Sequence, residues 1–178
     1  DWIHTNSIAY NAELDQILLS SNFLSEVYII DHSITTEQAA TCRGDLLWRW
    51  GNPRNYGAES PQKLFGQHNA HWIPAGCPGA GNILLFNNGG ALGPDVPNPG
   101  SSVDELVLPP MVPCLSAASS HLVYELAGPP SSQRRAVAEP VEGTFGPVES
   151  TWRFSADGFY GSYISGVQRL PNGNTLIN

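Results

Sequence analysis

Short runs of apolar and β-branched residues, separated by polar breaks, form two series along the chain. In the first series the runs cover residues 6–12, 15–23, 25–31 and 45–51. The second series follows at about residues 70–75, 81–88, 101–108 and 148–155. Runs of this length between Asn, Asp, Gly and Ser residues are typical of β-strands, so each series predicts a four-stranded antiparallel meander.

Other stretches of the chain have a different pattern. Residues 109–147 are rich in Pro, Gly and Ser and lack the period of a strand or a helix, which favours an irregular excursion on the surface. A third series contains the segment Pro171–Asn174, whose Asn-Gly pair favours a tight hairpin turn. A helix of one or two turns is predicted at residues 35–41, capped by Thr35 or Ser33.

A seven-residue run, a polar break and an apolar run recur three times in the sequence. The seven-residue runs begin at His4, His68 and Ser165, and the apolar runs that follow them open with Gln16, Asn82 and Asn174. The aromatic triplet Trp48–Trp50 returns as Trp152–Phe154 and closes each of the first two series. A repeated small sheet cannot bury both of its faces alone, so such repeats indicate stacked blades. The sequence predicts an all-β fold, a partial β-propeller of about two and a half four-stranded blades.

The repeat boundaries divide this propeller into its blades. We expect residues 1–178 to form a single partial propeller domain. The first blade covers about 4–53, the second about 64–157 with the insertion 109–147, and the third begins at about 159–178. Propellers generally close with about four to eight blades, so we interpret the chain as an internal fragment of a longer protein.

Two histidines stand at the head of successive repeats. The first strand of every propeller blade lines a central channel, so we expect His4 and His68 to point into one shared cavity. An imidazole can donate a hydrogen bond to an anion or move a proton near neutral pH, which makes both residues candidate catalytic groups. No metal site is predicted, because the equivalent place in the third repeat holds Ser165 and no carboxylate or Cys recurs there.

Charge and cysteine content narrow the possible partners. The formal net charge is −8 with only 8 Lys and Arg residues, which argues against nucleic acid and against anionic membrane surfaces. No run approaches the roughly 20 apolar residues of a membrane span. Cys42, Cys77 and Cys114 form no C-x-x-C motif, so neither a zinc site nor a complete disulfide framework is expected, although one pair can form in an oxidising compartment.

Several segments go beyond the general pattern of a propeller. They are residues 1–8, 65–72, 82–89, 159–162 and 168–175. These segments resemble the arylsulfotransferase (aryl-sulfate sulfotransferase) family. The resemblance implies a six-bladed propeller in the periplasm or secreted, which moves a sulfuryl group from a phenolic sulfate donor to a phenol acceptor. It further implies that no nucleotide cofactor takes part and that a histidine is sulfated on the way. His4 and His68 match the family's pocket histidines, and the nucleophilic histidine is expected beyond Asn178.

One position departs from the family pattern. Members of the family tend to carry an arginine shortly after the Asn-Gly that ends at Gly89, whereas this chain has Gly90–Gly93 without a basic residue. Either Arg54 or Arg134 substitutes for that charge, or the protein is an inactive or altered relative.

Four further residues complete the candidate site. Asn6 and Asn69 are expected to orient a ligand or a histidine, with turn capping as the alternative. Trp2 and Trp72 flank the histidines and are candidates for contact with a phenyl ring. The competing hypothesis is a non-catalytic propeller that binds a ligand or a protein through its channel face and residues 109–147.

Overall fold

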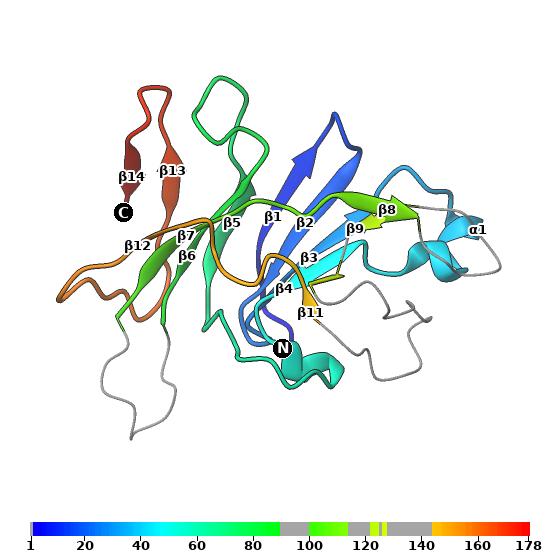
Figure 1. Ribbon diagram of the computed structural model, residues 1–178, viewed down its shortest axis with the longest axis horizontal. Helices are drawn as coiled ribbons and strands as arrows, with labels where there is room; N and C mark the ends of the chain where they lie inside the picture. Colours follow the sequence, from blue (N-terminus) through cyan, green and yellow to red (C-terminus); the bar gives the residue numbers. More distant parts are fainter. Residues whose placement is uncertain (1, 90–99, 114–121, 125, 128–143) are drawn as a thin grey trace.

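The computed structural model describes residues 2–89, 100–113, 122–124, 126–127 and 144–178, which form strands and little helix (Figure 1). The first sheet is a four-stranded antiparallel meander in the order β1-β2-β3-β4. Its strands are β1 (Thr5–Asn11), β2 (Gln16–Ser21), β3 (Glu26–Asp31) and β4 (Trp48–Trp50). All four lie within or across the first predicted series, so the all-β prediction is confirmed here.

The second sheet repeats this arrangement with one long connection. It is antiparallel in the order β5-β6-β7-β12. Its strands are β5 (His68–Trp72), β6 (Ile83–Asn87), β7 (Ser102–Leu106) and β12 (Trp152–Phe154). The strands again lie within or across the predicted runs, and the last one joins the sheet only after residues 109–147.

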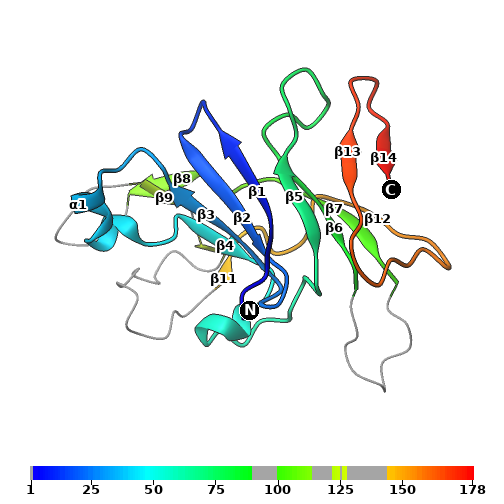
Figure 2. The same cartoon turned by 180° about the vertical axis from the view of Figure 1, so that it is seen from behind.

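The two sheets and a third hairpin stack side by side (Figure 2). The hairpin consists of β13 (Val167–Arg169) and β14 (Thr175–Ile177), joined at the predicted turn. One buried cluster joins the first sheet to one face of the second through Leu18, Ile29, Trp48, Ile83, Leu85 and Leu106. A second cluster joins the opposite face to the hairpin through Leu84, Phe86, Val103, Val167 and Ile177. The second sheet is therefore covered on both faces.

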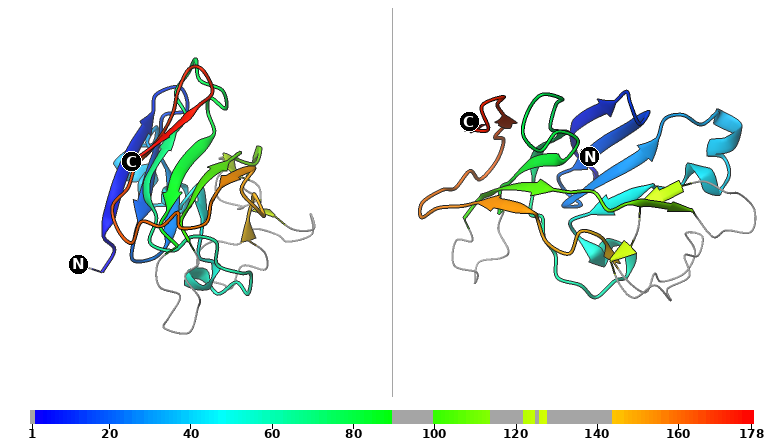
Figure 3. Two further views of the ribbon diagram at one scale, coloured as in Figure 1. Left: turned by 90° about the vertical axis from the view of Figure 1, so that its left-hand side faces the viewer. Right: turned by 45° about the horizontal axis from the view of Figure 1, so that its top comes forward.

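Only parts of residues 109–147, where the sequence predicts an irregular surface excursion, are among the described residues. They contain two short antiparallel pairs, β8 (Met111–Pro113) with β9 (Leu122–Tyr124) and β10 (Leu126–Ala127) with β11 (Thr144–Phe145). These strands lie beside the β4 edge of the first sheet (Figure 3). Strands of two or three residues are too short to show a period in the sequence, which is why the pattern missed them.

Side-chain contacts hold this segment against the first sheet. Tyr124 is 4% exposed, and its hydroxyl donates to Gln16 Oε1 at 2.9 Å. The indole N–H groups of Trp48 and Trp50 each donate at 2.7 Å to a backbone carbonyl, of Gly146 and Pro147 respectively. The aromatic triplet of the first sheet therefore binds the inserted segment as well as packing in the core.

The helical prediction near residue 35 is confirmed. Helix α1 (Thr36–Ala39) is capped by Thr35, whose hydroxyl accepts from Gln38 N–H while the Gln38 side chain accepts from Thr35 N–H. Single 3₁₀ turns follow at Cys42–Gly44 and Pro53–Tyr56. Among the described residues, no helix is long and apolar enough to cross a bilayer.

Candidate functional site

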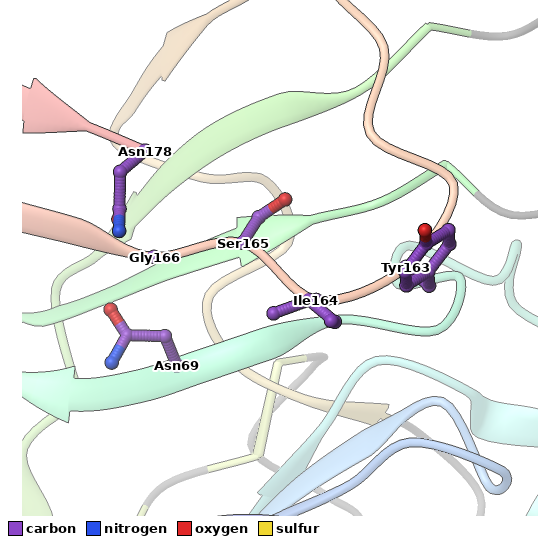
Figure 4. A pocket seen from close by; sticks show the side chains of 6 residues that line it. All are labelled: Asn69, Tyr163, Ile164, Ser165, Gly166 and Asn178. Atoms are coloured by element: carbon purple, nitrogen blue, oxygen red, sulfur yellow. The ribbon is translucent and has the colours of Figure 1, made fainter.

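A pocket lies where β5 meets the chain that enters β13. It has a volume of about 460 Å³ and opens to solvent. Its lining residues are Asn69, Tyr163, Ile164, Ser165, Gly166 and Asn178. Figure 4 shows the side-chain amides of Asn69 and Asn178 on either side of the chain at Gly166, with Tyr163 and Ile164 further along the same segment.

Hydrogen bonds with the chain at Gly166 and Val167 position the two asparagines of the pocket, Asn69 and Asn178. Gly166 and Asn178 exchange two backbone hydrogen bonds, at 2.9 and 3.0 Å. Asn69 has a left-handed backbone with φ of 55°, and its Oδ1 accepts from Val167 N–H at 2.8 Å. Since Oδ1 of Asn69 is occupied, its amide N–H₂ is the group left for a ligand.

His68 is connected to this pocket through one buried amide. Its Nδ1 lies 2.7 Å from Oδ1 of Asn88, a residue that is 1% exposed and follows β6. The Nδ2 of Asn88 donates to Gly161 O at 2.7 Å and to Ile164 O at 2.9 Å. A single side chain therefore holds both the imidazole and the segment that forms the pocket wall.

His4 lies in a different setting, at the exposed start of β1. Its ring stacks on Phe23 with centroids 4.9 Å apart and an interplanar angle of 20°. Its backbone has a positive φ of 49°, and its carbonyl accepts from Asn22 N–H at 3.0 Å. The two candidate histidines thus have different partners.

The strand registers also separate the two histidines. Tyr10 in β1 pairs with Ile17 and Trp72 in β5 pairs with Ile83, which are equivalent residues of the two apolar runs. His4 lies six residues before Tyr10, whereas His68 lies only four residues before Trp72. Two residues of a strand span roughly 6–7 Å, so the expected equivalence of the two positions is not what the registers show.

A difference in turn length explains this shift. The turn between β5 and β6 is longer than the turn between β1 and β2. The extra residues shift β5 along its partner strand, so residues at the same place in the two sequence repeats do not occupy the same place in the two sheets. In the second sheet the place of His4 is held by Gly66, and both residues have positive φ, 49° and 65°. His68 pairs with Phe86 in β6, and the equivalent residue of β2, Ser20, pairs with Ser7, so Ser7 holds the place of His68 in the first sheet.

Comparison with known families identifies the relationship. The family model described as Arylsulfotransferase (ASST) matches residues 1–178, the whole chain. The chain belongs to the arylsulfotransferase family. The expected resemblance is therefore confirmed, and small-molecule substrates are the partners that this family implies. A search of curated proteins found no match for the chain.

The other residues expected in an arylsulfotransferase site lie apart from the pocket, with the exception of Asn69. Asn6 Nδ2 donates to Gln67 O at 2.7 Å, so it contacts the residue before His68. Trp2 is 75% exposed near the start of the chain. Trp72 packs against the core shared by the two sheets, and its indole N–H is enclosed without a partner among the described residues.

Sequence reasoning did not single out Tyr163, Ile164 and Asn178, which line the pocket, or Asn88, which adjoins it. Asn178 comes into place only when β14 pairs with β13. Asn88 did leave a signal, because Asn22 stands at the same point after the apolar run of the first repeat. A repeated polar residue at the end of a buried strand indicates a structural or functional contact.

The charge expected of an anion pocket is not found in its lining, since all six lining residues are neutral. Four cations elsewhere in the described part of the chain are paired with carboxylates, namely Arg49, Lys63, Arg153 and Arg169. Arg54 is exposed in the 3₁₀ turn after β4. Arg134 and Gly90–Gly93 lie outside the described residues, so the source of a positive charge stays a prediction.

Metal and thiol chemistry receive no support from the described residues. None of their His, Cys, Asp and Glu side chains form a group of three that could hold a metal ion. Cys77 is a free thiol, and Cys114 lies outside the described part. The chemistry available at the pocket is therefore that of amides, the Ser165 hydroxyl, a phenol ring and the connected imidazole.

Proposed function

We propose that this protein transfers a sulfuryl group from a phenolic sulfate ester to a phenol, with His68 moving the proton. Membership of the arylsulfotransferase family supports the reaction class. The half-buried imidazole of His68 is held by Asn88, which also holds Ile164 in the pocket wall. This link between an imidazole and a pocket wall is the observation that carries the proposal.

The pocket offers the groups that this reaction needs. The S–O bond to the donor phenol breaks as the sulfuryl group passes to the nucleophilic histidine that the family implies, and the S–N bond formed there breaks as a new S–O bond to the acceptor forms. His68 gives a proton to the departing phenolate and then takes the hydroxyl proton of the acceptor. Charge spreads over the three outer sulfuryl oxygens, which fixed N–H donors stabilise. Asn69 and Asn178 are the proposed donors, and Tyr163 and Ile164 provide an apolar wall for an aromatic ring.

The remaining candidates take supporting roles in this proposal. His4 is the second proposed imidazole, presented at the exposed edge of the first sheet. Asn6 fixes the backbone beside His68 through its bond to Gln67 O. Trp2 is proposed to contact the aryl group, whereas Trp72 packs against the core between the two sheets. The nucleophilic histidine that the family implies is not assigned to a described residue.

We further propose that the stacked layers are blades of a β-propeller. The first strands lie next to one another, because Ser7 Oγ accepts from Ala70 N–H at 3.1 Å and Asn69 accepts from Val167 N–H. The outer face of the first sheet is apolar, and Ile8 and Tyr10 on it are 71% and 55% exposed. A further blade packed on this face would bury it. The family also supports a periplasmic or secreted location.

The experiment is a sulfotransfer assay with 4-nitrophenyl sulfate as donor and phenol as acceptor. We expect release of 4-nitrophenol that depends on the acceptor, and a fall of about 10²–10⁴-fold in kcat for His68→Ala. The matched control is His32→Ala, since His32 is an exposed histidine that is bonded to Asp15 and does not line the pocket. Equal activity of the two variants contradicts the role of His68, and the absence of any transfer by the unaltered protein contradicts the reaction.

A second function is favoured by one observation, the neutral lining of the pocket. A pocket without a cation suits an uncharged ligand better than a sulfate ester. Under this alternative the protein is a non-catalytic scaffold that binds a neutral aromatic compound or a protein. Calorimetry distinguishes the two, because the scaffold binds phenol with no preference for its sulfate ester and shows no turnover.

A further inference from the structure

Two asparagines make the same contact in successive sheets. Asn22 follows β2 and Asn88 follows β6. The Nδ2 of Asn22 donates to Gly66 O at 2.8 Å, just before β5 of the second sheet. The Nδ2 of Asn88 donates to Gly161 O and Ile164 O, just before β13 of the hairpin. Each amide therefore connects its sheet to the chain that enters the next layer.

The two contacts differ in what stands beside the amide. In the second sheet Oδ1 of Asn88 lies 2.7 Å from His68 Nδ1. In the first sheet the register position of His68 is occupied by Ser7, whose hydroxyl donates to Ala70 O at 3.3 Å. We call each place where such an amide holds the chain that enters the next layer a junction. At the second junction, which borders the pocket, the amide of Asn88 also contacts the imidazole of His68.

The orientation of the Asn88 amide decides the protonation of the imidazole. Its two backbone partners are carbonyl oxygens, which accept only, so the N–H₂ end of Asn88 must face them. Its Oδ1 then faces His68 and accepts only. Nδ1 of the neutral imidazole must therefore carry the hydrogen, and Nε2 is left with its lone pair. Among the described residues, no hydrogen bond occupies Nε2.

We propose that Asn88 is a positioning residue that holds neutral His68 in the tautomer protonated at Nδ1, so that Nε2 can take a proton from a ligand. The catalytic meaning of this arrangement rests on the proposed function, since Nε2 would receive the hydroxyl proton of the acceptor phenol. The tautomer itself rests only on the hydrogen bonds of Asn88.

The test reads the tautomer directly by ¹⁵N NMR of the histidine ring nitrogens, on the full chain at a pH where His68 is neutral. In the unaltered protein we expect a protonated Nδ1 and an unprotonated Nε2. Asn88→Leu removes the acceptor, and His68 should move toward the Nε2–H form that free imidazole side chains favour in water. Asn22→Leu is the matched control, because it removes the equivalent connection at the other junction and should leave His68 unchanged.

A second variant covers the case in which Asn88→Leu does not fold. Asn88→Asp keeps an acceptor at Nδ1 but loses both donors to the backbone, so His68 should keep the Nδ1–H form. The carboxylate also stabilises the protonated imidazole, so the acid limb of the pH–rate profile should move to higher pH. In the transfer assay we expect Asn88→Leu to lower kcat roughly ten- to a hundredfold, the usual cost of losing a partner that orients a histidine.

The outcomes separate this inference from the proposed function. A protonated Nε2 in the unaltered protein overturns the inference, and so does an unchanged tautomer in folded Asn88→Leu. If the tautomers behave as expected but no sulfate ester is turned over, the proposed function fails while the positioning role stands.

Discussion

The buried ion pair of the first sheet leads to a sharp prediction of stability. Glu26 has no exposed side-chain surface and accepts hydrogen bonds from Arg49 Nε at 2.9 Å and Arg49 Nη2 at 2.5 Å. Its Oε2 also accepts from Asn55 Nδ2 at 2.8 Å and from the Tyr28 hydroxyl at 3.0 Å. The guanidinium of Arg49 lies 4.3 Å from the ring centroid of Tyr56. The pair is thus completely hydrogen-bonded at its carboxylate.

Removing one partner leaves the other charge without compensation. In Glu26→Ala the guanidinium of Arg49, which is 19% exposed, remains in the sheet without its carboxylate. Loss of one member of a buried pair costs about 3–5 kcal/mol. With a urea dependence of roughly 2–3 kcal/mol/M for a chain of this size, the unfolding midpoint should fall by roughly 1–2 M. The double variant Glu26→Ala/Arg49→Ala should be less destabilised than the sum of the single variants, by about 1 kcal/mol or more.

An exposed ion pair in the same chain is the matched control. Lys63 is paired with Glu149, whose side chain is 61% exposed. Exposed pairs contribute at most about 1 kcal/mol, so Glu149→Ala should change the urea midpoint little. The reasoning is refuted if Glu26→Ala and Glu149→Ala unfold within about 1 kcal/mol of each other, or if the double variant shows simple additivity.

Two further predictions concern the turns. Gly79→Ala should destabilise the protein more than Gly76→Ala. Both glycines have positive φ, but a Cβ at Gly79 would also lie 2.5 Å from Oε1 of Glu105. Thermal unfolding compares the two variants, and equal losses of stability refute the role of the contact with Glu105. The hydrogen bonds from His32, and to a smaller extent from Tyr10, hold the pKa of the Asp15 carboxyl below its ordinary value of 3.8. The ionised carboxylate therefore contributes to folding stability above pH 3.8, and this contribution is lost as the pH falls through the lowered pKa. An NMR titration of the Asp15 carboxyl should give a midpoint below 3.8 that rises in His32→Ala, and an unchanged midpoint contradicts this cause.

The sequence contained most of the strand pattern and little of the pocket. Short apolar and β-branched runs between polar breaks identified both meanders, because strands buried between packed layers need apolar side chains. The apolar pattern did not predict that His4 and His68 occupy different places in their sheets. Such a pattern shows which face of a sheet a side chain lies on, but it does not give the number of residues in a turn. The pocket depends on contacts such as that of Asn69 with Val167, which join segments far apart in the chain.

The two junctions of the fold show how one connection can serve both structure and chemistry. Asn22 and Asn88 each hold the chain that leads into the next layer, so this contact belongs to the stacking of the layers. Stacking alone does not require an imidazole, because Ser7 occupies the register position of His68 in the first sheet. An imidazole at the second junction is therefore an addition to a contact that is already sufficient for folding. That surplus, beside an open pocket with amide donors, is the physical reason for locating the transfer chemistry between the second sheet and the hairpin.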